Sequence, residues 1–163
     1  YDKIDPQNLL RDAQIFAEFV MLYATSDRIL LDFRQTAEEI RIACEEWNKK
    51  SREGFELSDV LERLGVVSEE LERFYRADLP VQEYNRKVME IGRELVPLNL
   101  TTGNIYANDS ANPFPAVPSL MLMDQLIQAK PGSAEEKEII VALVHKKNYI
   151  RHSLLNVLKI IRE

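Results

Sequence analysis

Hydrophobic residues recur every three or four positions through most of the chain, a spacing that places them on one face of an α-helix. The first such segment runs from Pro6 to about Thr25. Asp5 before Pro6 is a typical helix start, because the carboxylate accepts hydrogen bonds from free backbone amides while proline has no amide hydrogen to lose. Alternation with a period of two is weak throughout. The pattern therefore predicts an all-α helical bundle, with at most a stray strand pair in its longest loop.

A second helix is expected from Asp32, a candidate N-cap, to about Ser51. Its apolar residues share one face: Phe33, Ala37, Ile40, Cys44 and Trp47. Cys44 is the only cysteine, which excludes an intramolecular disulfide and leaves the cellular compartment open. Because Cys44 lies on the apolar face and has no histidine near it in the sequence, we expect a buried, inert thiol.

Glycine and proline divide the next region of the chain. The segment 58–64 is predicted to be a short helix that ends at Gly65, since helices commonly end at a glycine in the left-handed conformation. Ser68 is a candidate cap of the helix that follows. Pro80 either interrupts that helix or begins a new one, which is expected to continue to about residue 96, where Pro97 ends it.

A long proline-rich segment, "PLNLTTGNIYANDSANPFPAVPSL", follows at residues 97–120 and is called the strap loop below. It holds four of the seven prolines in the chain. Loops of this length are usually functional or are pinned across the surface of their domain. Tyr106 and Phe114 favour a pinned strap and are its predicted anchors, and a ligand-contacting loop is the alternative.

The last helix has the clearest start. Ser133 and Glu136 form a capping box after a Pro-Gly break. Lys147 is the one polar residue in an apolar seam that repeats at steps of three and four, made of Ile140, Leu143, Ile150, Leu154, Val157 and Ile161. Periodicity leaves open whether this seam packs on its own chain or on a second copy. Ile150 and Leu154 are therefore candidate interface residues.

Charge and hydropathy exclude two classes of partner. A formal net charge of -6 over 163 residues argues against a nucleic-acid surface, which needs clustered Lys and Arg. The most apolar window, Ile15 to Ala24, is interrupted by Glu18 and is far shorter than the roughly 20 residues that cross a bilayer. The length fits one compact domain with an ordinary core.

Catalytic chemistry is not indicated by any motif. His145 and His152 lie seven residues apart on the last helix, about 10 Å along its axis, so one metal ion cannot bind both. Cationic residues surround them, which favours surface or interface histidines. A glycine-rich phosphate loop, a G-x-S-x-G elbow and a CxxC pair are all missing from the sequence. We therefore predict no catalytic residue and no metal ligand in this chain.

The first helix is apolar nearly all round, which is typical of a helix that is buried nearly all round. Leaving two or three such side chains in water forfeits about 1.5 to 3 kcal/mol each. The predicted interface on this helix consists of Ile15, Phe16, Phe19, Val20, Leu22 and Tyr23. We expect another polypeptide surface to cover it. For the isolated chain a homodimer is the simplest cover, because a self-complementary patch closes through a two-fold axis.

The opening stretch, "YDKIDPQNLLRDAQIFAEFVMLYAT", resembles the closing segment of the peptidase domain in zinc-dependent aminopeptidases and carboxypeptidases of the glutamate carboxypeptidase II and transferrin receptor type. Its core is Asp2-Lys3-Ile4-Asp5. Further along, "RILLDFRQTAEEI" and the stretch from "YNRKVMEIGRELV" to "PAVPSL" are similar to the helical dimerisation-type domain that follows in many members. Asn85, Arg86, Met89 and Arg93 carry the second similarity.

This resemblance implies two parts: residues 1–25 as the last helix of a preceding peptidase domain, absent here, and residues 26–163 as a helical dimerisation-like domain. The chain would be a non-catalytic C-terminal domain of a zinc exopeptidase that serves dimerisation and shapes the substrate cleft. Its partners would be its own peptidase domain and a second copy. The zinc ligands and catalytic glutamate of the family would precede Tyr1, so zinc is implied for the parent protein alone.

Two other functions remain open at this point. The chain could be an independent all-α module for protein–protein interaction, with its binding face on the first or last helix. It could also be an enzyme or small-ligand binder with a site inside the bundle. The reading frame upstream of Tyr1 separates the first of these from the peptidase hypothesis.

Overall fold

The computed structural model describes residues 5–102 and 114–163 of the chain. The one β-type pairing among these residues is an isolated bridge between Arg52 and Phe55. The prediction of an all-α helical bundle is therefore confirmed. The elements are, in chain order, α1 (Pro6–Thr25), α2 (Arg34–Asn48), α3 (Ser58–Arg76), α4 (Val81–Leu100), the 3-10 helix η1 (Pro118–Leu120), α5 (Leu122–Gln128) and α6 (Ala134–Arg162).

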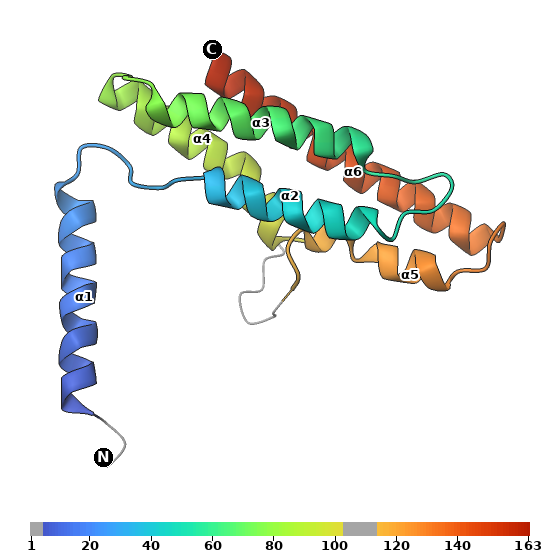
Figure 1. Cartoon of the computed structure of the whole chain (residues 1–163), viewed down its shortest axis with the longest axis horizontal. Helices are drawn as coiled ribbons and strands as arrows, with labels where there is room; N and C mark the ends of the chain where they lie inside the picture. The colour runs from blue at the N-terminus through green and yellow to red at the C-terminus, as the bar shows by residue number, and fades with distance from the viewer. Residues whose placement is uncertain (1–4, 103–113) are drawn as a thin grey trace.

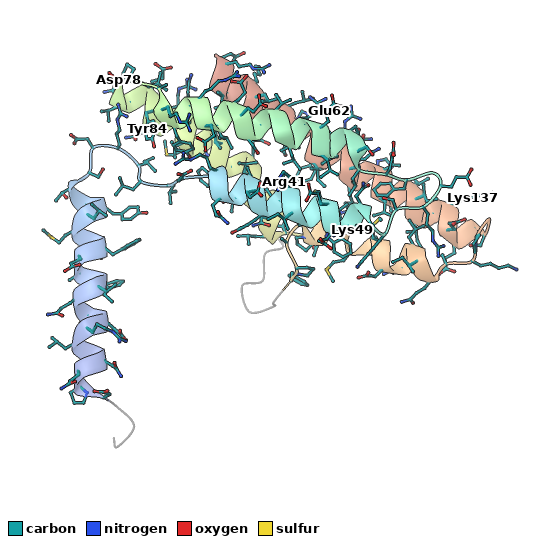
Figure 2. All side chains as sticks on the ribbon, in the orientation of Figure 1. Arg41, Lys49, Glu62, Asp78, Tyr84 and Lys137 are labelled. Carbon is teal, nitrogen blue, oxygen red and sulfur yellow. The ribbon has the colours of Figure 1, made fainter. Side chains whose placement is uncertain are left out.

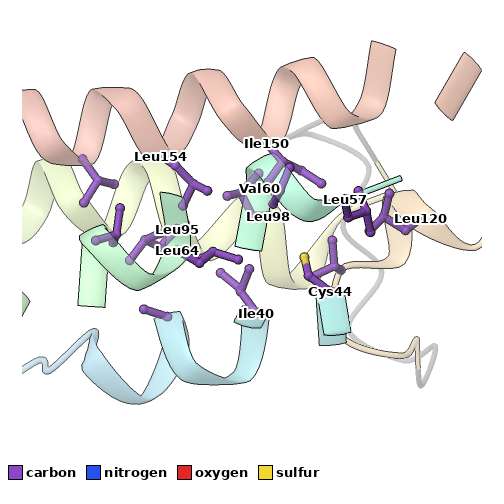
Figure 3. Packing of buried hydrophobic residues seen from close by; sticks show 14 of the residues in the cluster. Ile40, Cys44, Leu57, Val60, Leu64, Leu95, Leu98, Leu120, Ile150 and Leu154 are labelled. Carbon is purple, nitrogen blue, oxygen red and sulfur yellow. The ribbon is translucent and has the colours of Figure 1, made fainter. Parts of the chain in front are cut away.

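Helices α2, α3, α4 and α6 pack into an elongated bundle, and the short α5 lies against α6 (Figure 1). α1 stands apart from this bundle, directed across its long axis and joined to it by the extended segment 26–33 (Figure 1). Side chains such as Ile40, Leu64, Leu95 and Leu154 meet inside the bundle (Figure 3). Every buried residue of this core lies at or after Phe33, so α1 contributes none of them.

α1 begins and ends where the hydrophobic pattern predicted. The Asp5 carboxylate accepts a hydrogen bond from the backbone amide of Gln7 at 2.9 Å and another from the Asn8 side chain at 2.8 Å. Pro6 occupies the first turn, where its missing amide hydrogen costs nothing. The helix ends at Thr25, because Ser26 adopts an extended conformation.

α2 begins two residues later than Asp32 and ends at Asn48, before the predicted Ser51. Asp32 nevertheless serves the helix start, since its Oδ1 accepts the backbone amide of Arg34 at 2.9 Å. The predicted apolar face is buried along its full length: Phe33, Ala37, Ile40, Cys44 and Trp47 are each at most 7% exposed.

α3 corrects the prediction of a short helix ending at Gly65. One continuous helix passes through Gly65 and Ser68, so neither residue marks a boundary. The residues that hold it together are buried at steps of four and three: Val60, Leu64, Val67, Leu71 and Phe74. A glycine inside a helix costs about 1 kcal/mol relative to alanine, which is small against the burial of five large side chains.

α4 corrects the prediction that Pro97 ends the helix. Pro80 does precede a new helix, but that helix continues through Pro97 to Leu100. The carbonyl of Pro97 accepts the backbone amide of Thr101 at 3.0 Å and the Thr101 hydroxyl at 2.9 Å. Leu98, which is 1% exposed, anchors this last turn in the core. Core packing of the final turn thus outweighs the hydrogen bond that proline cannot donate.

Ser133 caps α6 as predicted, and Glu136 bonds back to the residue before the cap. Ser133 Oγ accepts the backbone amide of Glu136 at 3.1 Å, and the Glu136 carboxylate accepts the amide of Gly132 at 2.6 Å. Lys147, the polar exception in the seam, reaches the start of α3. Its Nζ donates to the carbonyl of Glu56 at 3.2 Å and lies 3.5 Å from the Asp59 carboxylate.

The seam of α6 packs within its own chain, against α3 and α4. Ile150 and Leu154 are fully buried there (Figure 3), so their assignment as interface residues is wrong. The same periodicity serves an intramolecular and an intermolecular seam, and only the placement of α3 and α4 distinguishes the two.

Candidate interaction surface

α1 exposes apolar side chains around most of its circumference, and none of its residues is buried. Figure 2 shows these side chains projecting from α1, and no other helix among the described residues lies beside it. The predicted interface residues are between 39% and 68% exposed: Ile15, Phe16, Phe19, Val20, Leu22 and Tyr23. Each large side chain left in water forgoes about 1.5 to 3 kcal/mol of burial free energy. The surface therefore has the composition of a core, and its contact with another chain remains a prediction.

The polar residues of α1 are mostly confined to one narrow stripe. Gln7, Arg11, Gln14 and Glu18 follow one another at steps of four, three and four, which aligns them along one side of the helix. Apolar residues dominate the other sides, where Asp12 is one exception. A surface that covers α1 must therefore enclose it on most sides and leave this polar stripe in water.

The segment 26–33 fixes the place where α1 leaves the bundle. Arg28 donates from Nη2 to the carbonyl of Leu79 at 2.7 Å. Asn85 clamps the segment from α4: its Oδ1 accepts the backbone amide of Ile29 at 2.8 Å, and its Nδ2 donates to the carbonyl of Asp27 at 2.8 Å. The segment is therefore bonded to the bundle along its length.

Tyr75 closes the other end of this segment. The backbone amide of Phe33 donates to the Tyr75 hydroxyl at 3.0 Å, and that hydroxyl donates to the carbonyl of Leu31 at 3.2 Å. Burial raises the pKa of Tyr75 to about 12, so the phenol keeps its proton at neutral pH and continues to donate. α1 is consequently presented by a pinned connection.

α4 carries a second apolar face that the bundle does not use. Its buried face consists of Val88, Ile91, Leu95 and Leu98. On another side, Met89 is 50% exposed and Val96 is 38% exposed, and Gly92 lies between them at helical spacing. Leu31 from the connecting segment is 48% exposed and borders the same face. This surface, Leu31 with Met89, Gly92 and Val96, is called the α4 face below.

A groove of about 410 Å³ lies in the α4 face, between α4 and the connecting segment. Phe33 lines it beside Gly92, where a side chain on α4 would collide with the phenylalanine ring: a Cβ at Gly92 would stand 2.6 Å from Phe33 Cζ. This face was not predicted from the sequence, although Met89, Gly92 and Val96 repeat at steps of three and four and could have indicated it.

Charged residues flank the α4 face on one side. Arg86 and Glu90 form an ion pair of 2.9 Å one turn apart on α4. Arg93 follows Glu90 by three residues and is exposed. Arg93 lines the groove of the α4 face, whereas Arg86, Glu90 and Arg93 together line a second groove that α4 forms with α6.

The predicted anchors of the strap loop have different outcomes. Tyr106 lies outside the described residues. Phe114 is 40% exposed, so it is not a core anchor, whereas Val117 is fully buried. The carbonyl of Ala116 lies 3.4 Å from Trp47 Nε1, which donates to it. Both described ends of the loop are fastened to the bundle: residues 97–100 belong to α4, with Leu98 in the core, and Val117 is buried at the other end.

The candidate nucleophile and metal ligands are not brought together. Cys44 is fully buried, and burial raises the pKa of its thiol to about 12, so the thiolate is not available at neutral pH. His145 and His152 are exposed on α6. In residues 5–102 and 114–163, no group of three or more His, Cys, Asp or Glu side chains is arranged to hold a metal ion.

None of the described helices is long and apolar enough to cross a membrane. Comparisons with protein-family models, with curated proteins and with solved structures found no match to the chain. The resemblance to zinc exopeptidases therefore rests on the sequence motifs alone.

Proposed function

We propose that this chain is a non-catalytic helical domain of a zinc exopeptidase, in which α1 packs on the peptidase domain and the bundle serves dimerisation and shaping of the substrate cleft. The observation that carries the proposal is the exposure of α1, whose apolar side chains are core-like in composition and free of contact with the bundle core. Residues 1–25 would belong to the peptidase domain and residues 26–163 to the helical domain.

The arrangement of α1 supports a broad covering surface. A single partner helix covers a stripe about 100° wide, whereas apolar side chains dominate most of the α1 circumference outside the line through Gln7, Arg11, Gln14 and Glu18. The side of a folded domain, with a sheet and neighbouring helices, encloses a helix more fully. The motif around Asp5 is the feature that suggests a peptidase domain for this role.

The connecting segment supports a fixed arrangement of the two parts. Its hydrogen bonds to Leu79 and Asn85 hold α1 at one place relative to the bundle. A domain packed on α1 would therefore keep a defined position beside α4. Such placement is what a helical domain needs in order to shape a neighbouring cleft.

The first test reads the genomic reading frame upstream of Tyr1. We expect it to encode an α/β peptidase domain with an H-x-D motif, paired acidic zinc ligands and a terminal histidine motif. A methionine start just before Tyr1, with no peptidase in frame, would overturn the proposal.

The second test uses the complete gene product. Replacing Phe16 and Phe19 together by Glu should release α1, because two charges cannot be buried unpaired. We expect loss of peptidase activity together with a lower thermal midpoint. Gln14→Glu, on the polar stripe of the same helix, is the matched control and should leave both unchanged. Wild-type activity and midpoint in the double variant would contradict packing through α1.

An independent all-α interaction module is the second candidate. It is favoured by one observation: the bundle forms its entire buried core from residues at or after Phe33. A unit with a complete core can fold alone and carry α1 as a binding arm. The upstream reading frame separates this candidate from the first, since an independent module requires no peptidase domain in frame.

A further inference from the structure

An acidic groove of about 670 Å³ lies along α2, at the end of the bundle where α5 is found (Figure 1). It is formed by the face of α2 from Glu39 to Lys50, with Pro115, Ala116 and Asp124 as the other walls, and is called the α2 groove below. We propose that the α2 groove binds a peptide segment of another protein in the polyproline II conformation, with two arginines three positions apart and prolines between them.

The floor of the α2 groove is apolar. Ile42, which is 47% exposed, and Ala43 line it from α2, and Pro115 and Ala116 line it from the described end of the strap loop. This wall is held in place, since Trp47 Nε1 donates to the carbonyl of Ala116 at 3.4 Å. The volume lies within the range of about 300 to 1,000 Å³ that is typical of ligand sites. The floor therefore suits small apolar side chains such as proline.

Carboxylates outnumber cations among the residues that line the groove, since Glu39, Glu46 and Asp124 are accompanied there by a single lysine. Glu39 accepts a hydrogen bond from the neutral side-chain amide of Asn99 at 3.1 Å, which leaves its charge in place. Glu46 pairs with Lys49 at 2.5 Å, but the two side chains are 63% and 68% exposed. Such an exposed pair is weak and is readily exchanged for another cation. The charge of the groove thus favours a basic ligand.

Lys50 shows how one end of the groove holds a cation. Its Nζ lies 4.2 Å from the centroid of the Trp47 ring and 2.7 Å from Asp124 Oδ1. An aromatic face beside a carboxylate is a typical arrangement for binding an ammonium or a guanidinium group. Lys50 is flexible and 39% exposed, so a bound peptide can displace it and uncover the ring. Arginine suits this place better than lysine, because its planar group stacks on aromatic rings and pairs with carboxylates through two hydrogen bonds.

The spacing of the carboxylates favours one peptide conformation. Glu39 and Glu46 are seven residues apart, so they lie on the same side of α2, about 10 Å apart along its axis. In a polyproline II helix, residues three apart share a face and are separated by about 9 Å. In a β-strand, residues on one face are separated by about 7 or 13 Å, which fits less well. An α-helical partner matches the distance only with residues seven apart, a difference that the peptides below separate.

Trp47 is the only tryptophan of the chain, so its fluorescence reports directly on the groove. The probe is the peptide Pro-Arg-Pro-Pro-Arg-Pro, blocked at both ends and titrated into the whole chain, with calorimetry as a second measurement. All chains carry Phe19→Glu, which limits association through α1. We expect saturable binding of one peptide per chain.

Charge removal on α2 tests the two predicted ion pairs. Glu39→Gln and Glu46→Gln should each weaken peptide binding about two- to fivefold, the range of exposed ion pairs. Glu62→Gln removes the same charge from an exposed position on α3 (Figure 2) and should leave binding unchanged. Circular dichroism with thermal melting checks that each variant is folded.

Two further peptides test the spacing and the contact. Pro-Pro-Arg-Arg-Pro-Pro has the same composition with adjacent arginines and should bind more weakly than the probe. Glu39→Lys should reverse the preference of the chain, so that a peptide with one arginine replaced by glutamate binds more tightly than the probe. Attraction between net charges alone predicts the opposite order, because the chain is acidic overall and the exchanged peptide is less basic.

Several outcomes would overturn the proposal. One is the absence of any change in fluorescence or heat up to about 1 mM peptide. Another is binding that is indifferent to both glutamine variants, or equal for the two peptides of the same composition. Equal affinity for arginine amide would assign the groove to a small organic cation, and tighter binding of a helical peptide with arginines seven apart would assign it to a helix. These results are independent of the upstream reading frame and of α1, so they stand apart from the tests of the peptidase assignment.

Discussion

Gly65 and Gly92 show how two identical residues on similar helices take different roles. Both lie inside long helices, α3 and α4. A Cβ at Gly65 would meet nothing within 4 Å, whereas a Cβ at Gly92 would meet the Phe33 ring. At Gly65 a residue with higher helix propensity would fit without a clash. At Gly92 glycine is required, because α4 approaches the connecting segment closely.

Alanine at the two positions should have opposite effects on stability. Gly65→Ala is expected to raise the free energy of unfolding by about 0.5 to 1 kcal/mol, because alanine loses less backbone entropy in a helix. Gly92→Ala is expected to lower it by about 1 kcal/mol or more, since overpacking against the 7%-exposed Phe33 outweighs the same propensity gain. Urea unfolding measures both.

A second substitution controls for the cause at Gly92. Phe33→Leu shortens the side chain that a new Cβ would strike, so Gly92→Ala should cost less in that background than in the wild type. Equal costs in the two backgrounds would show that Phe33 is not the obstacle.

At the scale of elements, the strap loop illustrates how burial decides which residue holds a segment. Val117 is fully buried and adopts φ 54°, a left-handed conformation that is uncommon for a β-branched residue. Its carbonyl accepts the backbone amide of Leu120 at 3.0 Å, which starts the turn of η1. Burial in the core and the hydrogen bond of this turn together stabilise Val117 in a backbone conformation that is unfavourable for valine in isolation.

Truncation should therefore be costly at Val117 and cheap at Phe114. Val117→Ala removes two buried methyl groups and is expected to destabilise the chain by about 1 to 2 kcal/mol. Phe114→Ala changes a side chain that is 40% exposed and should cost less than about 0.5 kcal/mol. Thermal melting of the two variants ranks them, and a larger loss at Phe114 would restore it as the anchor.

In the whole molecule, the bundle has a buried hydrophobic core, whereas the apolar side chains of α1 are exposed. The bundle buries a contiguous core from α2 to α6, while α1 leaves nine large apolar side chains at least 39% exposed: Leu9, Leu10, Ile15, Phe16, Phe19, Val20, Met21, Leu22 and Tyr23. A surface of this kind associates with whatever apolar surface it meets. In the isolated chain the available surface is that of other copies.

We therefore expect the isolated wild-type chain to associate through α1 as its concentration rises. Phe19→Glu should lower the mass measured by light scattering, because a buried unpaired charge is costly. Gln14→Glu, on the polar stripe of α1, should leave the mass unchanged. Equal masses for wild type and Phe19→Glu across the concentration series would show that α1 does not associate.

The class of fold and the starts of the helices with clear caps can be predicted from local sequence alone. The starts of α1 and α6 follow from local chemistry, since Asp5 and Ser133 bond to backbone amides within three residues. The buried face of α2 followed from periodicity for the same reason: the relevant neighbours are near in sequence. The apolar circumference of α1 was likewise evident, because it concerns composition around one helix.

Where packing overrides a local signal, the outcome depends on contacts between residues that are distant in the sequence. α3 continues through Gly65 and α4 through Pro97 because the residues beyond them, such as Val67 and Leu98, are buried by other helices. Ile150 belongs to the core because α3 and α4 cover it. The spacing of apolar residues along α6 does not predict which helices will cover them. The α4 face is exposed because the other helices of the bundle pack against a different side of α4.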